Sequence, residues 1–74
     1  MSLLSENIRK MRKELRLLQS EMAEELAKSQ KINVSQRQVS YWETGTLEPD
    51  IDTLIALAKF FSTSVDELHG VDGY

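Results

Sequence analysis

The sequence lacks cysteine, and its 74 residues include one proline, one histidine and three glycines. Without cysteine the chain can form neither disulfide bonds nor thiolate metal sites, and a cytoplasmic location fits this composition. No apolar run approaches the ~20 residues that cross a bilayer, so we expect no membrane segment. A chain this short buries only about 60% of its unfolded surface, so we expect one domain, 1–74, with an economical core.

Groups that could support catalysis or bind a metal are also scarce. His69 is the single histidine, and no second ligand-spaced group accompanies it. Solvated faces and helix N-terminal charges account for the carboxylate pairs Glu24–Glu25 and Asp50/Asp52. The sequence has no glycine-rich phosphate loop and no nucleophile–base pair at a recognisable spacing. We therefore expect no enzyme, no metal site and no cofactor. Because no sensor domain fits in so short a chain, we also expect no small-molecule inducer.

The charge is distributed unevenly along the chain. The net charge is −3 and the pI is about 5.0, which alone argues against a nucleic-acid partner. Residues 1–37, however, hold eight Lys/Arg against five acids, a balance of +3. Residues 38–74 hold one lysine against seven acids, a balance of −6. The basic first half therefore keeps a nucleic-acid partner open.

Apolar spacing predicts an all-α fold of five short helices. A first helix over about 3–16, with basic outer faces, is indicated by apolar residues at three- and four-residue steps: Leu4, Ile8, Met11, Leu15 and Leu18. A second helix is expected from about Gln19, although Leu18 before it is a poor cap.

The later helices have clearer start signals. Ser35 with Gln38 forms a capping box for the third helix, and Gly45 suits its left-handed end. Asp50 can cap a fourth helix after Pro49. This segment is the most apolar and should be central, with Ile51, Leu54, Ile55, Leu57, Ala58 and Phe61.

Ser64 and Glu67 form a second capping box, which opens a short fifth helix. Gly70 ends this helix, and we expect the tail, residues 71–74, to be loose.

The third helix, within VSQRQVSYWETG (residues 34–45), has few apolar residues. At about 100° per residue, Val39 and Trp42 share one edge, whereas Gln36, Arg37, Ser40 and Tyr41 fall on the opposite side. Glutamine matches adenine and arginine matches guanine with two hydrogen bonds each. We therefore expect Trp42 to anchor the helix in the core while the polar face reads bases.

The sequence resembles the phage-repressor/Cro type of helix-turn-helix domain, also called XRE-type. The resemblance covers nearly everything from Ile8 to Gly70, and its signature is Ser35, Val39, Ser40, Trp42, Glu43 and Gly45. The later Pro49, Leu54, Leu57, Ala58 and VDEL (residues 65–68) strengthen it. It implies a five-helix lambda-repressor-like fold that binds double-stranded DNA.

The resemblance also implies roles for individual residues. Those matching base-reading positions are Gln36, Arg37, Tyr41 and Ser40. Gln19 matches the glutamine that holds a phosphate at the start of the second helix, and Thr44 and Thr46 match a loop that touches the backbone. Arg12 and Glu43 match a structural ion pair between the first and third helices.

The sequence departs from the family pattern between the second and third helices. AKSQKIN (residues 27–33) fills a gap that one glycine usually occupies. Either the second helix runs on, or the turn becomes a loop in which Ile32 packs beneath and Asn33 takes the left-handed conformation. Lys28 and Lys31 are phosphate candidates there; a solvated helix extension is the alternative.

Two other departures reduce the expected affinity for DNA. Leu18 replaces a polar cap, and Thr46, Leu47 and Glu48 stand where arginine or lysine is common. Basic residues of the first helix compensate for this loss of affinity only if that helix approaches the DNA backbone: Arg9, Lys10, Lys13 and Arg16.

The sequence thus predicts a homodimeric transcription regulator, most simply a repressor that blocks a promoter, with half-sites about one helical turn apart. Dimer contacts are expected around Val65, Leu68 and Val71. The rival hypothesis keeps the fold but makes it an antitoxin-like or regulator-binding module whose acidic second half binds a regulatory protein or a toxin.

Overall fold

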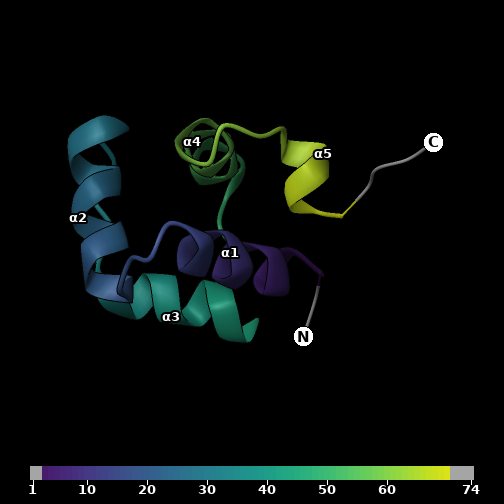
Figure 1. Ribbon diagram of the computed structural model, residues 1–74, viewed down its shortest axis with the longest axis horizontal. Coiled ribbons are helices and arrows are strands. Elements are labelled where there is room, and N and C mark those ends of the chain that lie inside the picture. Colours follow the sequence, from purple (N-terminus) through teal and green to yellow (C-terminus); the bar gives the residue numbers. More distant parts are fainter. Residues whose placement is uncertain (1–2, 71–74) are drawn as a thin grey trace.

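A computed structural model describes residues 3–70, which form five helices and no strand. The helices are α1 (Leu3–Glu14), α2 (Gln19–Ser29), α3 (Gln36–Thr44), α4 (Ile51–Phe60) and α5 (Val65–Leu68). α3 lies along one side of α1, and α4 and α5 lie on the other side (Figure 1). α2 packs against both α3 and α4 and so closes one end of the bundle. The expectation of an all-α, five-helix fold is confirmed.

One apolar cluster, to which all five helices contribute, forms the core. Its most enclosed side chains, with no solvent exposure, are Ile8, Met22, Leu26, Val39, Leu57 and Leu68. Trp42 joins them and is 5% exposed, so the expected anchoring role of Val39 and Trp42 is confirmed. Because these two side chains hold α3 by one edge, its opposite face is turned away from the core.

α1 ends at Glu14, two residues before the expected boundary. Arg16 adopts a left-handed φ of 58°, and the Leu17 N–H donates to the Arg12 carbonyl at 3.2 Å, which closes the helix end.

The apolar stripe of the first helix therefore stops early. Leu15 and Leu18 are 49% and 65% exposed, and Leu17 packs against the core instead. The expectation that Leu15 and Leu18 continue the buried stripe is wrong, because α1 ends at Glu14, before either residue.

α4 begins as expected, because the Asp50 carboxylate accepts a hydrogen bond from the Thr53 N–H at 2.8 Å. Leu54, Leu57 and Ala58 are buried. Ile51 and Ile55, one turn apart, are 62% and 42% exposed. The expectation of a central segment is therefore confirmed for one face of α4 and is wrong for Ile51 and Ile55, which lie on the face presented to solvent.

The connection between α2 and α3 combines the two alternatives. α2 continues through Ser29, and residues 30–35 form a loop. Lys31, with φ 56°, is the left-handed residue, so the expectation for Asn33 is wrong. Lys31 directly follows the C-cap Gln30, the position at which helices most often turn left-handed. Ile32 is half-buried and packs against the core, as expected.

Within residues 3–70, no helix has the length and apolarity that a membrane crossing requires.

Candidate nucleic-acid interface

The two faces of α3 differ sharply in exposure. Gln36 and Arg37 are exposed, and Ser40 and Tyr41 are half-buried. On the other side Val39 is fully buried and Glu43 is 3% exposed. The side chains expected to read bases therefore share an accessible face, although Ser40 and Tyr41 offer less of their surface than the first two.

The start of α3 is held by its own residues. The Gln38 N–H donates to the Ser35 hydroxyl at 3.3 Å, and the Ser35 N–H donates to the Gln38 side-chain oxygen at 2.9 Å. This capping box satisfies two backbone amides that the first turn would otherwise leave without a partner. Gln38 is therefore committed to the cap, whereas Gln36 and Arg37 remain available for a ligand.

The end of α3 brings two threonines together. Gly45 has φ 77° and turns the chain, and the Thr44 and Thr46 hydroxyl oxygens are 2.8 Å apart. Thr44 Oγ1 also lies 3.1 Å from the Ser40 carbonyl oxygen. A hydroxyl has one proton, so contact with a phosphate requires at least one of these bonds to be exchanged.

Gly45 fixes the distance between this turn and α1. A Cβ at Gly45 would lie 3.3 Å from the Ser5 hydroxyl oxygen, and the left-handed backbone itself disfavours other residues. The threonine pair is therefore held beside α1.

An ion pair ties α1 to α3, as the resemblance implied. Arg12 Nε donates to Glu43 Oε2 at 2.6 Å, and Arg12 Nη2 donates to Glu43 Oε1 at 2.9 Å. Arg12 Nη1 also donates to the Leu17 carbonyl at 2.7 Å. The two side chains are 11% and 3% exposed, so this charged pair is largely removed from solvent.

Gln19 joins the same network from the start of α2. Its Nε2 donates to Glu43 Oε1 at 3.2 Å. The amide group carries a second N–H and an oxygen that can face a ligand. Leu18 offers no side-chain acceptor to the first turn of α2, where backbone amides have no acceptor within the helix. Gln19 thus makes a structural hydrogen bond to Glu43, and its phosphate contact stays a prediction.

The structure groups only part of the expected phosphate set. Gln19 and Thr44 line one depression together with Arg9, Arg12 and Glu43. Lys28 and Lys31 are exposed but do not line it. They belong to the C-terminal end of α2 and to the following loop, and Figure 1 shows this end of α2 farther from α3 than its start.

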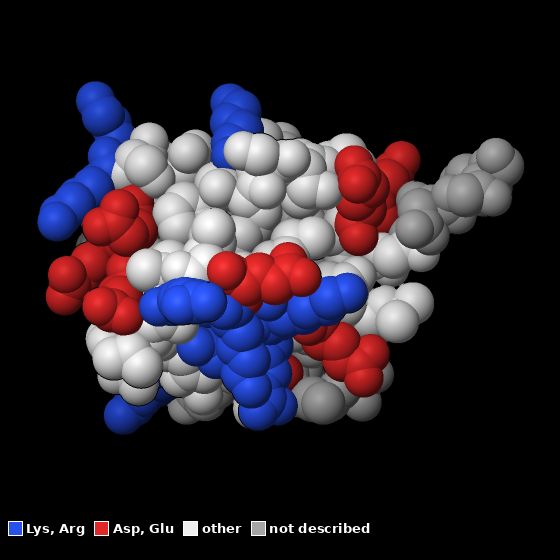
Figure 2. All heavy atoms as spheres, in the orientation of Figure 1, with Lys and Arg blue, Asp and Glu red and all other residues white. Residues whose placement is uncertain are grey.

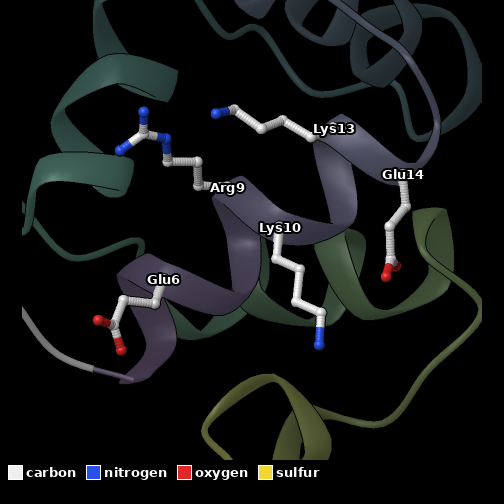
Figure 3. A pocket seen from close by; sticks show the side chains of 5 residues that line it. All are labelled: Glu6, Arg9, Lys10, Lys13 and Glu14. Atoms are coloured by element: carbon white, nitrogen blue, oxygen red, sulfur yellow. The ribbon is translucent and has the colours of Figure 1, made fainter.

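Basic side chains also gather over α1. Figure 2 shows Lys and Arg over its exposed face with acidic groups among them, and further acidic groups over α2 and α5 at the two sides. Five charged residues of α1 line a shallow groove there (Figure 3): Glu6, Arg9, Lys10, Lys13 and Glu14. Arg9, which the sequence offered only as one of four basic residues of the first helix, is the one of these four that joins Gln19 and Thr44. Its three-residue spacing from Arg12, which puts both on one side of the helix, is the signal that could have found it.

The expected dimer contacts on α5 need a correction. Leu68 has no solvent exposure and is part of the core, so it cannot contact a partner. Val65 is half-buried against the core, and Val71 lies outside the described residues. The position of Leu68 in a four-residue helix explains the difference, because so short a helix must be held by its one buried apolar residue.

Comparison with known proteins gives results consistent with this geometry. A family model described as "Helix-turn-helix" matches residues 8–68. The "HTH-type transcriptional activator BcrR" of Enterococcus faecalis is 34% identical over 64 residues, which are 86% of this chain and 28% of that protein. The chain therefore spans less than a third of the length of this relative.

A solved structure is also similar over nearly the whole chain. It is that of the P22 c2 repressor protein in complex with the synthetic operator 9T in the presence of Tl+, with a TM-score of 0.76 and 35% identity. The likeness covers 97% of this chain and 100% of that one. The match to a phage repressor confirms the resemblance to the phage-repressor/Cro type. The chain belongs to the helix-turn-helix family.

Proposed function

We propose that this helix-turn-helix protein, a DNA-binding transcriptional regulator, is a sequence-specific repressor that reads the major groove with α3. The observation that carries the proposal is the contrast between the two faces of α3. Val39 and Trp42 fix the helix in the core, and Gln36 and Arg37 stand exposed on its other side. An α-helix fits the major groove, where amide and guanidinium groups distinguish base pairs through paired hydrogen bonds.

The phosphate contacts of this proposal flank α3. Gln19 lies at the start of α2, and Thr44 and Thr46 lie at the end of α3 and just beyond it. Contacts of this kind set the register of a protein on DNA, while base contacts give specificity. Lys28 and Lys31 would add charge from the end of α2 and the following loop if the duplex passes along them.

The regulator acts as a homodimer in this proposal, because one helix as short as α3 reads too few base pairs to select a site. Two-fold symmetric half-sites would be about one helical turn apart on one face of the duplex. The exposed surface of α5 around Val65 supplies the contact, in place of the buried Leu68. Repression follows when the dimer occupies a promoter, and the likeness to the P22 c2 repressor supports that direction of regulation. The protein acts in the cytoplasm and has no catalytic activity in this proposal.

Selection of bound duplexes from a random pool tests the proposal. The enriched duplex is then titrated calorimetrically at two salt concentrations. We expect a motif with two related half-sites and an affinity that falls as salt rises, because bound phosphates release counterions. A pool that yields no enriched motif, together with no binding at low salt, would contradict the proposal.

A second candidate is a protein-interaction module with the same fold, and α4 favours it. Ile51 and Ile55 are exposed on neighbouring turns, and acids lie close by in the sequence at Glu48, Asp50 and Asp52. Such a surface suits a regulatory protein with an apolar and basic binding face. The same calorimetric titration separates the two candidates, since this one predicts no binding to duplex DNA even at low salt and on selected sequences.

A further inference from the structure

We propose that the depression between α1, α2 and α3 is a binding site for one phosphate of the DNA backbone, with Arg9 as its charged ligand. The inference rests on the proposed function and adds α1 to the elements that contact DNA. The depression has a volume of about 230 Å³ and is lined by Arg9, Arg12, Gln19, Glu43 and Thr44. These residues come from the middle of α1, the start of α2 and the end of α3.

The charge balance of the depression leaves one positive group for a ligand. Two guanidinium groups face one carboxylate, which gives a surplus of one positive charge. Arg12 and Glu43 satisfy each other through two hydrogen bonds, and Gln19 completes the partners of Glu43. Arg9 is exposed and, among residues 3–70, forms no ion pair or hydrogen bond. The unneutralised charge of the depression is therefore that of Arg9.

The direction of the Arg9 side chain supports the assignment. Figure 3 shows its guanidinium group reaching from α1 toward α3, whereas Lys10 points to the opposite side of α1. Lys10 lines the shallow groove over α1 but not the depression. These two adjacent cations are thus directed at different surfaces, and of the two only Arg9 lies with Gln19 and Thr44.

The chemistry of the lining fits a phosphodiester. A guanidinium group offers a planar fork of N–H donors that suits two phosphate oxygens, and a phosphodiester keeps its charge at any physiological pH. The Gln19 amide and the Thr44 hydroxyl can add neutral donors. Arg12 is a positioning residue here. Its guanidinium group is bound to Glu43 and to the Leu17 carbonyl, and these contacts hold the three helices around the depression.

The test compares Arg9→Ala with the matched control Lys10→Ala, which removes the same charge one residue away. Binding to the enriched duplex is measured by fluorescence anisotropy over a salt series. We expect Arg9→Ala to weaken binding about tenfold, as the loss of a charge-assisted hydrogen bond does. We also expect a salt dependence that is shallower by about one released counterion per protomer, with an unchanged base preference. Lys10→Ala should stay within about twofold of the wild type.

A second measurement locates the phosphate. Duplexes with one backbone phosphate at a time replaced by a neutral methylphosphonate are titrated with wild type and Arg9→Ala. We expect one position per half-site at which the replacement weakens wild-type binding but leaves Arg9→Ala binding unchanged, because the contact is already lost. A purely structural role for Arg9 would give no such position.

The outcomes separate this inference from the function on which it rests. If the wild type binds no duplex, the proposed function fails and this site fails with it. If the wild type binds and Arg9→Ala behaves as Lys10→Ala does, only the assignment of Arg9 is overturned. Inorganic phosphate alone is a further probe. Suppose that inorganic phosphate binds saturably and only when Arg9 is present, while Arg9→Ala leaves duplex binding unaffected. The depression would then be a site for a free anion, and the DNA assignment would be overturned.

Discussion

Arg12 of α1 and Glu43 of α3 meet through two parallel hydrogen bonds of 2.6 Å and 2.9 Å, in a place where Glu43 is only 3% exposed. The pair joins helices that are far apart in the sequence, and the Gln19 side chain adds α2 to the same carboxylate. The orientation of α3 relative to the first two helices therefore depends on an electrostatic contact as well as on Val39 and Trp42.

Breaking this pair on one side should destabilise the fold strongly. Arg12→Met leaves the Glu43 carboxylate buried without its main partner, and we expect a loss of about 3–5 kcal/mol in the free energy of unfolding. The double variant Arg12→Met/Glu43→Leu removes both charges and should recover a large part of that loss. Urea unfolding of the wild type, both single variants and the double variant measures the coupling. Additive effects of the two changes would show that the pair does not act as a unit.

Ser62 offers a stabilising substitution outside the proposed DNA surface. It follows the α4 C-cap Phe61 with a left-handed φ of 55°, a conformation that costs a residue with a Cβ about 1 kcal/mol. Ser62→Gly should therefore raise the free energy of unfolding by about 0.5–1 kcal/mol. Ser62→Ala, which keeps the Cβ, is the matched control and should not stabilise. Equal unfolding midpoints for the two variants would argue against a left-handed residue at this position.

Asp50 should make stability depend on pH in the acid range. Hydrogen bonds from the Thr53 side chain and backbone N–H hold the pKa of the Asp50 carboxyl below its ordinary 3.8. Because the folded state favours the charged form, this contribution is present above the ordinary pKa and is lost as pH falls through the lowered folded-state pKa. Asn also caps helices but does not titrate there.

Thermal unfolding of wild type and Asp50→Asn from pH 6 down to pH 2 measures this contribution. The difference in stability between the two proteins should be constant at the upper end of the series and should shift against the wild type below about pH 4. A difference that does not change with pH would show that the Asp50 charge adds nothing to the cap.

The helices that sequence reasoning placed best are those whose ends are set locally. Ser35, Gly45 and Asp50 act on backbone groups within a few residues, so their roles follow from the order of residues alone. The fully buried Val39 and the Trp42 side chain were also predictable, because α3 offers no other apolar edge.

The errors arose where tertiary packing decides between similar residues. Nothing in the local sequence distinguishes the exposed Ile55 from the buried Leu54. They differ only in position, because Leu54 lies on the side of α4 that meets α2 and α5. The left-handed Arg16 and Lys31 carry none of the glycine or asparagine signals of a helix end, so the real ends of α1 and α2 were hidden. The grouping of Arg9 with Gln19 and Thr44 joins three helices and could be seen only in the fold.

If α3 reads base pairs through its exposed polar face, Arg37→Ala should change which duplexes the protein selects. Selection from a random duplex pool followed by titration of the enriched sequences is done for wild type, Arg37→Ala and the control Lys59→Ala, which removes an exposed cation on α4. We expect Arg37→Ala to relax the preference at one base position per half-site, at a cost of about 1–3 kcal/mol, and Lys59→Ala to keep the wild-type motif. An Arg37→Ala protein that selects the same motif with the same affinity as the wild type would contradict base reading by α3.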